Sequence, residues 1–102
     1  MYVKIYSFFS FFLGIVLSWN MTKPGSQANI ANYQIYAYQE TNNVKPEALL
    51  WKKVGDVKAL PLPMACTLTQ FQKGNKYHFA VRAKDQHQRV GFFSEPQSIA
   101  LT

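Results

Sequence analysis

Residues 77–84 read YHFAVRAK, and this stretch decides the fold. Its apolar residues Tyr77, Phe79, Val81 and Ala83 recur at every second position. Successive side chains of a β-strand point to opposite faces, so a period of two puts these four on one face. The residues between them then face outward. The sequence therefore predicts a strand with one buried face.

The turn before this strand has a recognisable spacing. Phe71 and Gly74 stand six and three positions before Tyr77. This layout is typical of a tyrosine corner, in which the tyrosine hydroxyl bonds back to the backbone a few residues upstream. The alternative is that Tyr77 is an ordinary strand aromatic. The corner favours a β-sandwich, in which it joins two sheets.

Further short alternations occur at regular spacing along the chain. We expect strands over 14–20, 33–38, 50–57, 66–69 and 98–101, separated by turns or loops at 23–26, 41–46 and 72–75. Pro61 and Pro63 predict an extended connection or sheet edge, because proline lacks the donor that a central strand needs. Such spacing predicts an all-β sandwich of antiparallel sheets. The expected core residues are Trp19, Tyr33, Ile35, Leu68, Phe71, Tyr77, Phe79 and Val81.

The N-terminal segment can be interpreted in two ways. Residues 1–17 read MYVKIYSFFSFFLGIVL, which is about the length of a signal peptide, and a glycosylation sequon begins at Asn20. However, no small-x-small cleavage site follows, and cleavage there would remove Ile15 and Leu17 from a predicted strand. The run is also too short to predict a membrane span. We expect residues 1–13 to be an atypical apolar segment and residues 14–102 to be the domain, with its first strand atypical or missing.

The sequence does not predict an enzyme, a cofactor or a metal site. Cys66 is the single cysteine, which excludes an internal disulfide and favours a reducing compartment. The acidic residues are spread over separate loops, so none form an acid–base pair. His78 and His87 are nine positions apart and lack a third metal ligand at plausible spacing. There is no glycine-rich phosphate loop.

Taken together, residues 14–102 resemble a fibronectin type III domain. The matching segments are Leu17-Ser18-Trp19, Tyr33-Gln34-Ile35, 67–71 and 77–83. Residues 58–71, KALPLPMACTLTQF, are more specific, because ordinary fibronectin domains carry a polar segment there. This stretch is similar to the C-terminal fibronectin type III domain of the activating transcription factor 7-interacting protein family. Members of that family are also called methyl-CpG-binding-protein-associated chromatin factors. The similarity extends to residues 14–20, 36–38, 51–55 and 79–85. Residues 88–94, QRVGFFS, depart from the family pattern.

This resemblance implies a non-enzymatic docking module of a nuclear transcriptional co-regulator. Members of the family link histone methyltransferase silencing complexes to methyl-CpG-binding repressors. The implied partner is the repression domain of a methyl-CpG-binding protein, with no small-molecule substrate. The alternative is a secreted or cell-surface adhesion or receptor domain, with residues 1–17 as signal peptide.

Alternation also predicts where a protein partner would bind. Tyr36 and Tyr38 face away from the core residues of their strand, and Arg82 and Lys84 do the same on a strand expected to lie beside it. Tyrosine and arginine are enriched at binding hot spots, so we expect these four residues to form a docking patch that extends to Trp51. The alternatives are an ordinary half-exposed sheet face, or strand addition at the edge over 51–57.

The positive charge gives little support for nucleic-acid binding. The chain has 11 Lys and Arg against 5 Asp and Glu, a formal net charge of +6. Eight of these cations lie between residues 50 and 90, but no base-reading motif accompanies them. Scattered surface lysines that keep the domain soluble explain the pattern better, so we do not expect direct nucleic-acid binding.

Overall fold

The described part of the chain forms only strands, turns and irregular segments. The structure is a computed structural model, and it describes residues 3–11, 14–21, 30–40, 51–69, 71 and 76–100, with the backbone alone at 6–11. The strands are β1 (Val3–Phe11), β2 (Gly14–Met21), β3 (Ile30–Glu40), β4 (Lys52–Lys58), β5 (Met64–Leu68), β6 (Lys76–Asp85) and β7 (Gln97–Ala100).

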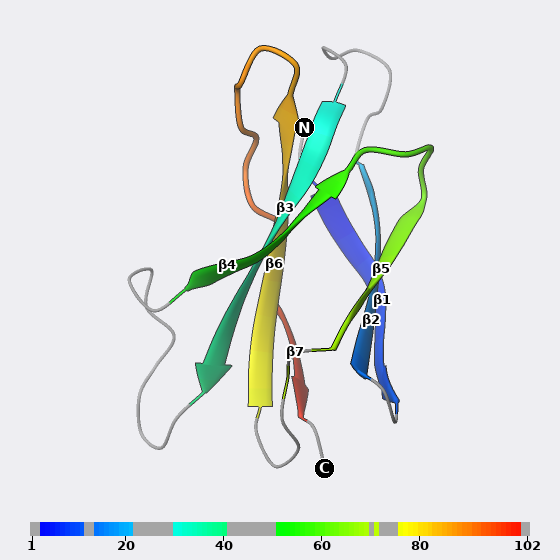
Figure 1. Cartoon of the computed structure of the whole chain (residues 1–102). Coiled ribbons are helices and arrows are strands. Elements are labelled where there is room, and N and C mark those ends of the chain that lie inside the picture. Colours follow the sequence, from blue (N-terminus) through cyan, green and yellow to red (C-terminus); the bar gives the residue numbers. More distant parts are fainter. Residues whose placement is uncertain are drawn as a thin grey trace.

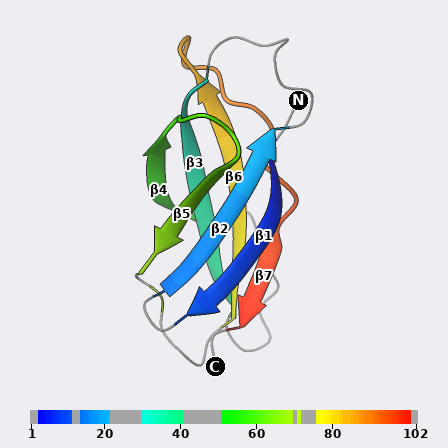
Figure 2. The ribbon, with the colours of Figure 1, turned by 90° about the vertical axis from the view of Figure 1, so that its right-hand side faces the viewer.

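These strands build two antiparallel sheets that pack face to face. One sheet has the order β1-β2-β5 and the other the order β4-β3-β6-β7. Figure 1 shows the two layers side by side, and Figure 2 shows β1, β2 and β5 lying across the larger sheet. The predicted all-β sandwich is therefore confirmed.

The core lies between the sheets and follows the period of two. Of the expected core residues, Trp19, Tyr33, Ile35, Leu68, Tyr77, Phe79 and Val81 are buried, and Phe71 is partly buried against them. Trp19 is fully buried and meets the ring of Tyr33 edge-on, with 5.5 Å between the ring centroids. The two sheets therefore interlock through aromatic side chains from β2 and β3.

The first strand, which we expected to be atypical or missing, is present and has an irregular register. β1 pairs with β2 from Val3–Met21 to Phe11–Gly14, with a register irregularity between Ile5 and Ser7. Val3 and Ile5 are buried in the core, so the sandwich extends to residues before 14. Adjacent apolar residues at 8–9 and 11–13 hide the alternation of the strand in the sequence, and the proline-led entry that would mark it is absent.

Several predicted boundaries shift by a few residues. The strand expected over 50–57 begins at Lys52, after Trp51, and the strand expected over 66–69 begins at Met64. Pro61 and Pro63 lie between β4 and β5, outside both ladders, as the missing donors require. The turns expected at 23–26, 41–46 and 72–75 lie outside the described residues.

We expect Tyr77→Phe to lower the free energy of unfolding by about 0.5–1.5 kcal/mol, the contribution of one hydrogen bond. Tyr77 is buried, and its ring centroid lies 4.6 Å from that of Phe71, a contact that phenylalanine preserves. The upstream turn that would accept the hydroxyl lies outside the described residues, so the corner stays a prediction. Urea unfolding measures the loss, and an unchanged midpoint would contradict the corner.

Candidate docking site

The outer face of the larger sheet carries two rows of cross-strand neighbours. The pairing of β3 with β4 and with β6 aligns them as Lys53–Tyr36–Ala80 and Asp56–Gln34–Arg82. Residues paired directly across a ladder point to the same face, so these side chains share the surface opposite the core. The predicted neighbourhood of Tyr36 and Arg82 therefore exists in the structure.

The segment from Gly91 to Pro96 is attached to β6 and borders this face. The backbone N–H of Ser94 donates to the carbonyl of Val81 at 2.8 Å, and the Val81 N–H donates to Ser94 Oγ at 2.9 Å. The N–H of Gly91 donates to the carbonyl of Ala83 at 2.9 Å. These bonds fix the backbone on both sides of Phe93, which places its ring beside the outer face.

Asp85 closes the loop that leads into this segment. Its carboxylate accepts from the backbone N–H groups of His87 and Arg89 and from Arg89 Nε, at 2.7–2.9 Å. These contacts, above all the bond from the Arg89 backbone, lower the pKa of the Asp85 carboxyl below its ordinary value. The carboxylate therefore stays charged at neutral pH and keeps the loop closed.

Arg82, Tyr36 and Phe93 form a packed cluster at the centre of the face. Arg82 Nε donates to Gln34 Oε1 at 2.7 Å, and Nη2 donates to the Tyr36 hydroxyl at 3.3 Å. The guanidinium carbon lies 4.7 Å from the Phe93 ring centroid and 5.3 Å from that of Tyr36. The two rings meet edge-on at 5.0 Å. These contacts hold the arginine in one orientation.

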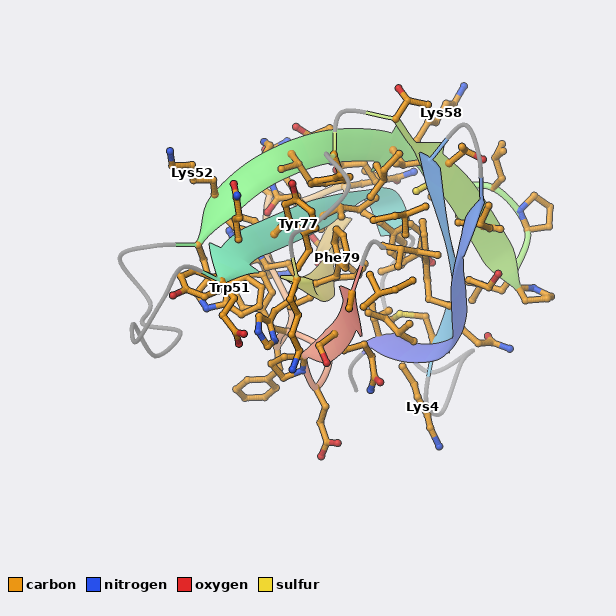
Figure 3. The ribbon with its side chains drawn as sticks, turned by 90° about the horizontal axis from the view of Figure 1, so that it is seen from below. Lys4, Trp51, Lys52, Lys58, Tyr77 and Phe79 are labelled. Atoms are coloured by element: carbon orange, nitrogen blue, oxygen red, sulfur yellow. The ribbon has the colours of Figure 1, made fainter. Side chains whose placement is uncertain are left out.

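An apolar cavity of about 360 Å³ opens beside this cluster. Its lining residues are Tyr36, Trp51, Ala80, Phe93, Ser94 and Pro96. The Ser94 hydroxyl already bonds to Val81, so the wall offers mainly apolar contact. Figure 3 shows Trp51 beside the end of β3, away from the inter-sheet space that holds Phe79. The cavity is large enough for a side chain of a binding partner.

The predicted patch of five residues is only partly assembled. Tyr36 and Trp51 line the cavity, and Arg82 lies against two of its wall residues. Lys84 pairs with Asn32 further along the sheet and does not line the cavity.

Tyr38 does not offer an exposed ring, which corrects the prediction. It points to the outer face, but only 3% of its surface is exposed. The rings of Trp51 and His78 lie 6.0 and 5.8 Å from it, and they cover it. Alternation predicts which face a side chain is on, but not which residues cover it. Tyr38 therefore packs beneath Trp51 and is not itself a contact surface.

The aromatic residues that follow β6 were not among the predicted site residues. Phe92 is 79% exposed and Phe93 is 42% exposed, and Val90 just before them is also exposed. Two adjacent phenylalanines after a polar hairpin were a usable signal, because a folded monomer rarely leaves such residues in water without a function.

The titratable side chains of the described residues are dispersed over the fold. Burial raises the pKa of the Cys66 thiol to about 11, so the thiol stays protonated and is a poor nucleophile. No three side chains of the His, Cys, Asp and Glu types come together within the described ranges. His78 Nε2 lies 3.1 Å from Glu40 Oε1 in an isolated pair. No described helix is long and apolar enough to cross a membrane.

We expect Ser94→Ala to destabilise the domain by about 1–3 kcal/mol, because it leaves the buried Val81 N–H without its acceptor. Ser94 is 3% exposed, so water cannot replace the lost hydroxyl. Urea unfolding measures the change, and hydrogen exchange at Val81 should accelerate. Ser98→Ala on the half-buried β7 is the matched control, and an equal loss there would contradict the specific role of Ser94.

Comparison with known proteins agrees with this architecture. A family model described as a fibronectin-III type domain matches residues 4–98. Among solved structures, the twitchin kinase region from C. elegans matches with a TM-score of 0.70 and 16% identity, over 97% of this chain and 15% of that one. Pectate lyase PelI from Erwinia chrysanthemi matches with a TM-score of 0.72 and 12% identity, over 96% of this chain and 28% of that one. At such identities these structures support the fold alone.

Sequence relatives are more specific. The chain is 56% identical over 89 residues to activating transcription factor 7-interacting protein 1 of Gallus gallus and of Homo sapiens. It is 47% identical over 87 residues to activating transcription factor 7-interacting protein 2 of Homo sapiens. These matches cover 83–84% of this chain but only 8%, 7% and 12% of the respective relatives. The chain therefore belongs to the fibronectin type III family, and its resemblance to the domain of the activating transcription factor 7-interacting proteins is confirmed.

Proposed function

We propose that this chain is a non-enzymatic protein–protein docking module of a nuclear transcriptional co-regulator. Its partner is a chromatin repressor, namely the repression domain of a methyl-CpG-binding protein. The observation that carries the proposal is the apolar cavity between Trp51, Tyr36 and Phe93, with the exposed Phe92 nearby in the chain. The relatives are named for interaction with a transcription factor, which supports a protein partner.

The composition of the cavity suits protein binding better than small-molecule chemistry. Tyrosine, tryptophan and arginine dominate binding hot spots because they bury much area with few rotatable bonds. Here Tyr36 and Trp51 line the wall, and Arg82 lies directly against Tyr36. One sheet face of a small domain offers an interface at the low end of the size range, so we expect a dissociation constant on the order of micromolar.

Calorimetric titration of the 102-residue chain with the repression domain tests this proposal. Apolar anchoring predicts that affinity changes only a few-fold between about 50 and about 200 mM salt, whereas a DNA-binding protein with several phosphate contacts loses roughly 10³–10⁵. The double variant Tyr36→Ala, Phe93→Ala should weaken binding at least about tenfold. Thr67→Ala, on the exposed face of β5 in the other sheet, is the control.

Two results would contradict the proposal. Binding that survives the double variant would place the site elsewhere, most simply on the free edge of β4 near Trp51, where a peptide could add as a strand. DNA binding with steep salt dependence, together with no binding of the repression domain, would favour an electrostatic function.

A nuclear location is part of the same proposal. It is supported by the relatives, which are named for interaction with a transcription factor. Removal of residues 1–17 would delete β1 together with the buried Ile15 and Leu17, so we propose that these residues are part of the sandwich. Expression of the tagged chain in cultured cells should place it in the nucleus. Recovery from the medium with a glycan on Asn20 would contradict this location and favour the receptor alternative.

A further inference from the structure

Arg82 at the candidate docking site has no acidic partner among the residues that the structure describes. Three described acidic residues have partners of their own: Asp56 forms an ion pair with Lys53 and Asp85 one with Arg89, and Glu40 Oε1 lies 3.1 Å from His78 Nε2. Glu95, the remaining described one, lines a separate small cavity with Val3, Lys4, Ile5 and Gln97. The guanidinium instead bonds to two neutral oxygens, Gln34 Oε1 and the Tyr36 hydroxyl.

The contacts of Arg82 orient its guanidinium so that an anion could bind it. Its guanidinium rests against the rings of Tyr36 and Phe93, and the two hydrogen bonds fix its plane. A guanidinium carries five N–H donors, so donors remain after these two bonds. Because the side chain is ordered before binding, an incoming ligand has less conformational entropy to remove. Arginine in such a fixed orientation suits the paired oxygens of a carboxylate.

The same two aromatic residues line the cavity and contact Arg82. Tyr36 and Phe93 line the apolar cavity on one side and touch Arg82 on the other. A ligand that fills the cavity with an apolar side chain therefore brings the neighbouring residues of its chain to the guanidinium. The net charge of +6 raises the local concentration of acidic segments and disfavours basic ones.

We propose, on the basis of the docking function above, that the partner segment places an aspartate or glutamate within one or two residues of a bulky apolar side chain. The apolar side chain fills the cavity between Trp51 and Phe93. The carboxylate binds Arg82, which makes Arg82 the residue that selects among apolar segments. Selection arises because an uncharged or basic segment leaves the guanidinium unpaired at the edge of the closed interface.

Selection of a displayed random peptide library on the 102-residue chain tests this inference. Peptides recovered on the unmodified chain should share an acidic residue next to an aliphatic or aromatic one. A recovered peptide is then synthesised together with its counterpart in which asparagine or glutamine replaces the acidic residue. The loss of the carboxylate should weaken binding to the unmodified chain at least about tenfold, the range for a hydrogen bond between charged groups.

The same two peptides are titrated against Arg82→Gln and against Lys58→Gln. With Arg82→Gln they should bind with equal affinity, since the group that distinguishes them is gone. Lys58→Gln removes one positive charge from the exposed end of β4. Figure 3 shows the Lys58 side chain pointing away from the molecule. This variant should keep the full difference in affinity between the two peptides. The peptide substitution leaves the protein unchanged, so the test holds even where Arg82→Gln loosens the cluster.

The outcomes separate this inference from the docking function. Peptides that need Tyr36 and Phe93 but share no acidic residue would overturn the role of Arg82 and leave the docking function standing. Equal weakening by Lys58→Gln would also overturn it, because general charge attraction would then explain the preference. Recovery only of peptides whose binding ignores Tyr36 and Phe93 would overturn both.

Discussion

Trp19→Ala is expected to lower the free energy of unfolding by about 3–5 kcal/mol, the range for removal of a buried large aromatic side chain. Trp19 is fully buried between the sheets, and its ring meets that of Tyr33 edge-on. The substitution leaves a cavity whose walls belong to both sheets, so neighbouring side chains can close it only in part. Urea unfolding of the two chains measures the difference. A loss of this size is a large fraction of the stability of an ordinary domain.

Trp51→Ala is the matched control, since it removes the same side chain from the surface. Trp51 is half-buried and covers Tyr38, so we expect a loss of about 1 kcal/mol or less. Trp19→Phe keeps part of the packing and removes an indole N–H that has no hydrogen-bond partner among the described residues, so its effect should be intermediate. It also provides a measurable variant if Trp19→Ala does not fold. Equal losses for Trp19→Ala and Trp51→Ala would contradict the sandwich core.

The sequence predicts the core because the core depends on local alternation. Each strand with a regular period of two has its apolar face buried, as Ile15, Leu17 and Trp19 show on β2. On β3 the same rule separates Tyr33 and Ile35, which face the core, from Tyr36, which faces outward. The alternation of apolar and polar residues is strong because one face of each sheet is buried in the core and the other is exposed to solvent.

The first strand shows where that rule fails. β1 contributes Val3 and Ile5 to the core, but adjacent apolar residues further along the run remove the alternation. The strand forms because its backbone pairs with β2, and this pairing is a contact between segments that a local pattern does not encode. A hydrophobic run at an N-terminus therefore resembles a signal peptide and an edge strand equally well.

The candidate site was harder to predict because segments distant in the sequence build it. Tyr36 and Arg82 come together through the β3–β6 ladder, which the family resemblance implied. Phe93 reaches them because Ser94 bonds to Val81, and Gly91 to Ala83, on β6. Tyr38 is lost from the surface for a similar reason, since Trp51 covers it. Alternation thus predicts which face of the sheet a side chain is on and which residues lie beside it. It does not predict whether other side chains cover that residue, because the covering residues come from segments outside the strands.

Gly14→Ala is expected to destabilise the domain by about 3 kcal/mol, through steric overlap rather than loss of packing. Gly14 begins β2 with a φ of +157°, a conformation that residues with a side chain rarely adopt. A Cβ atom built there would lie 2.2 Å from the carbonyl oxygen of Leu68. That oxygen belongs to the backbone at the end of β5, so it cannot rotate away. The change must shift the start of β2 or separate it from β5, and urea unfolding should show the loss.

Gly55→Ala provides the control, because it makes the same substitution in β4 without the overlap. A Cβ atom there would lie 4.0 Å from Ile35 Cδ1, which is an ordinary van der Waals contact. Replacement of glycine at an unstrained position reduces the freedom of the unfolded chain, so Gly55→Ala should be neutral or stabilise the domain by up to about 1 kcal/mol. Comparing the two variants separates the effect of the steric overlap at Gly14 from the general effect of replacing a glycine with alanine. Similar stability of the two variants would mean that β2 does not approach Leu68 closely at Gly14, and the pairing of β2 with β5 would have to begin further along the strand.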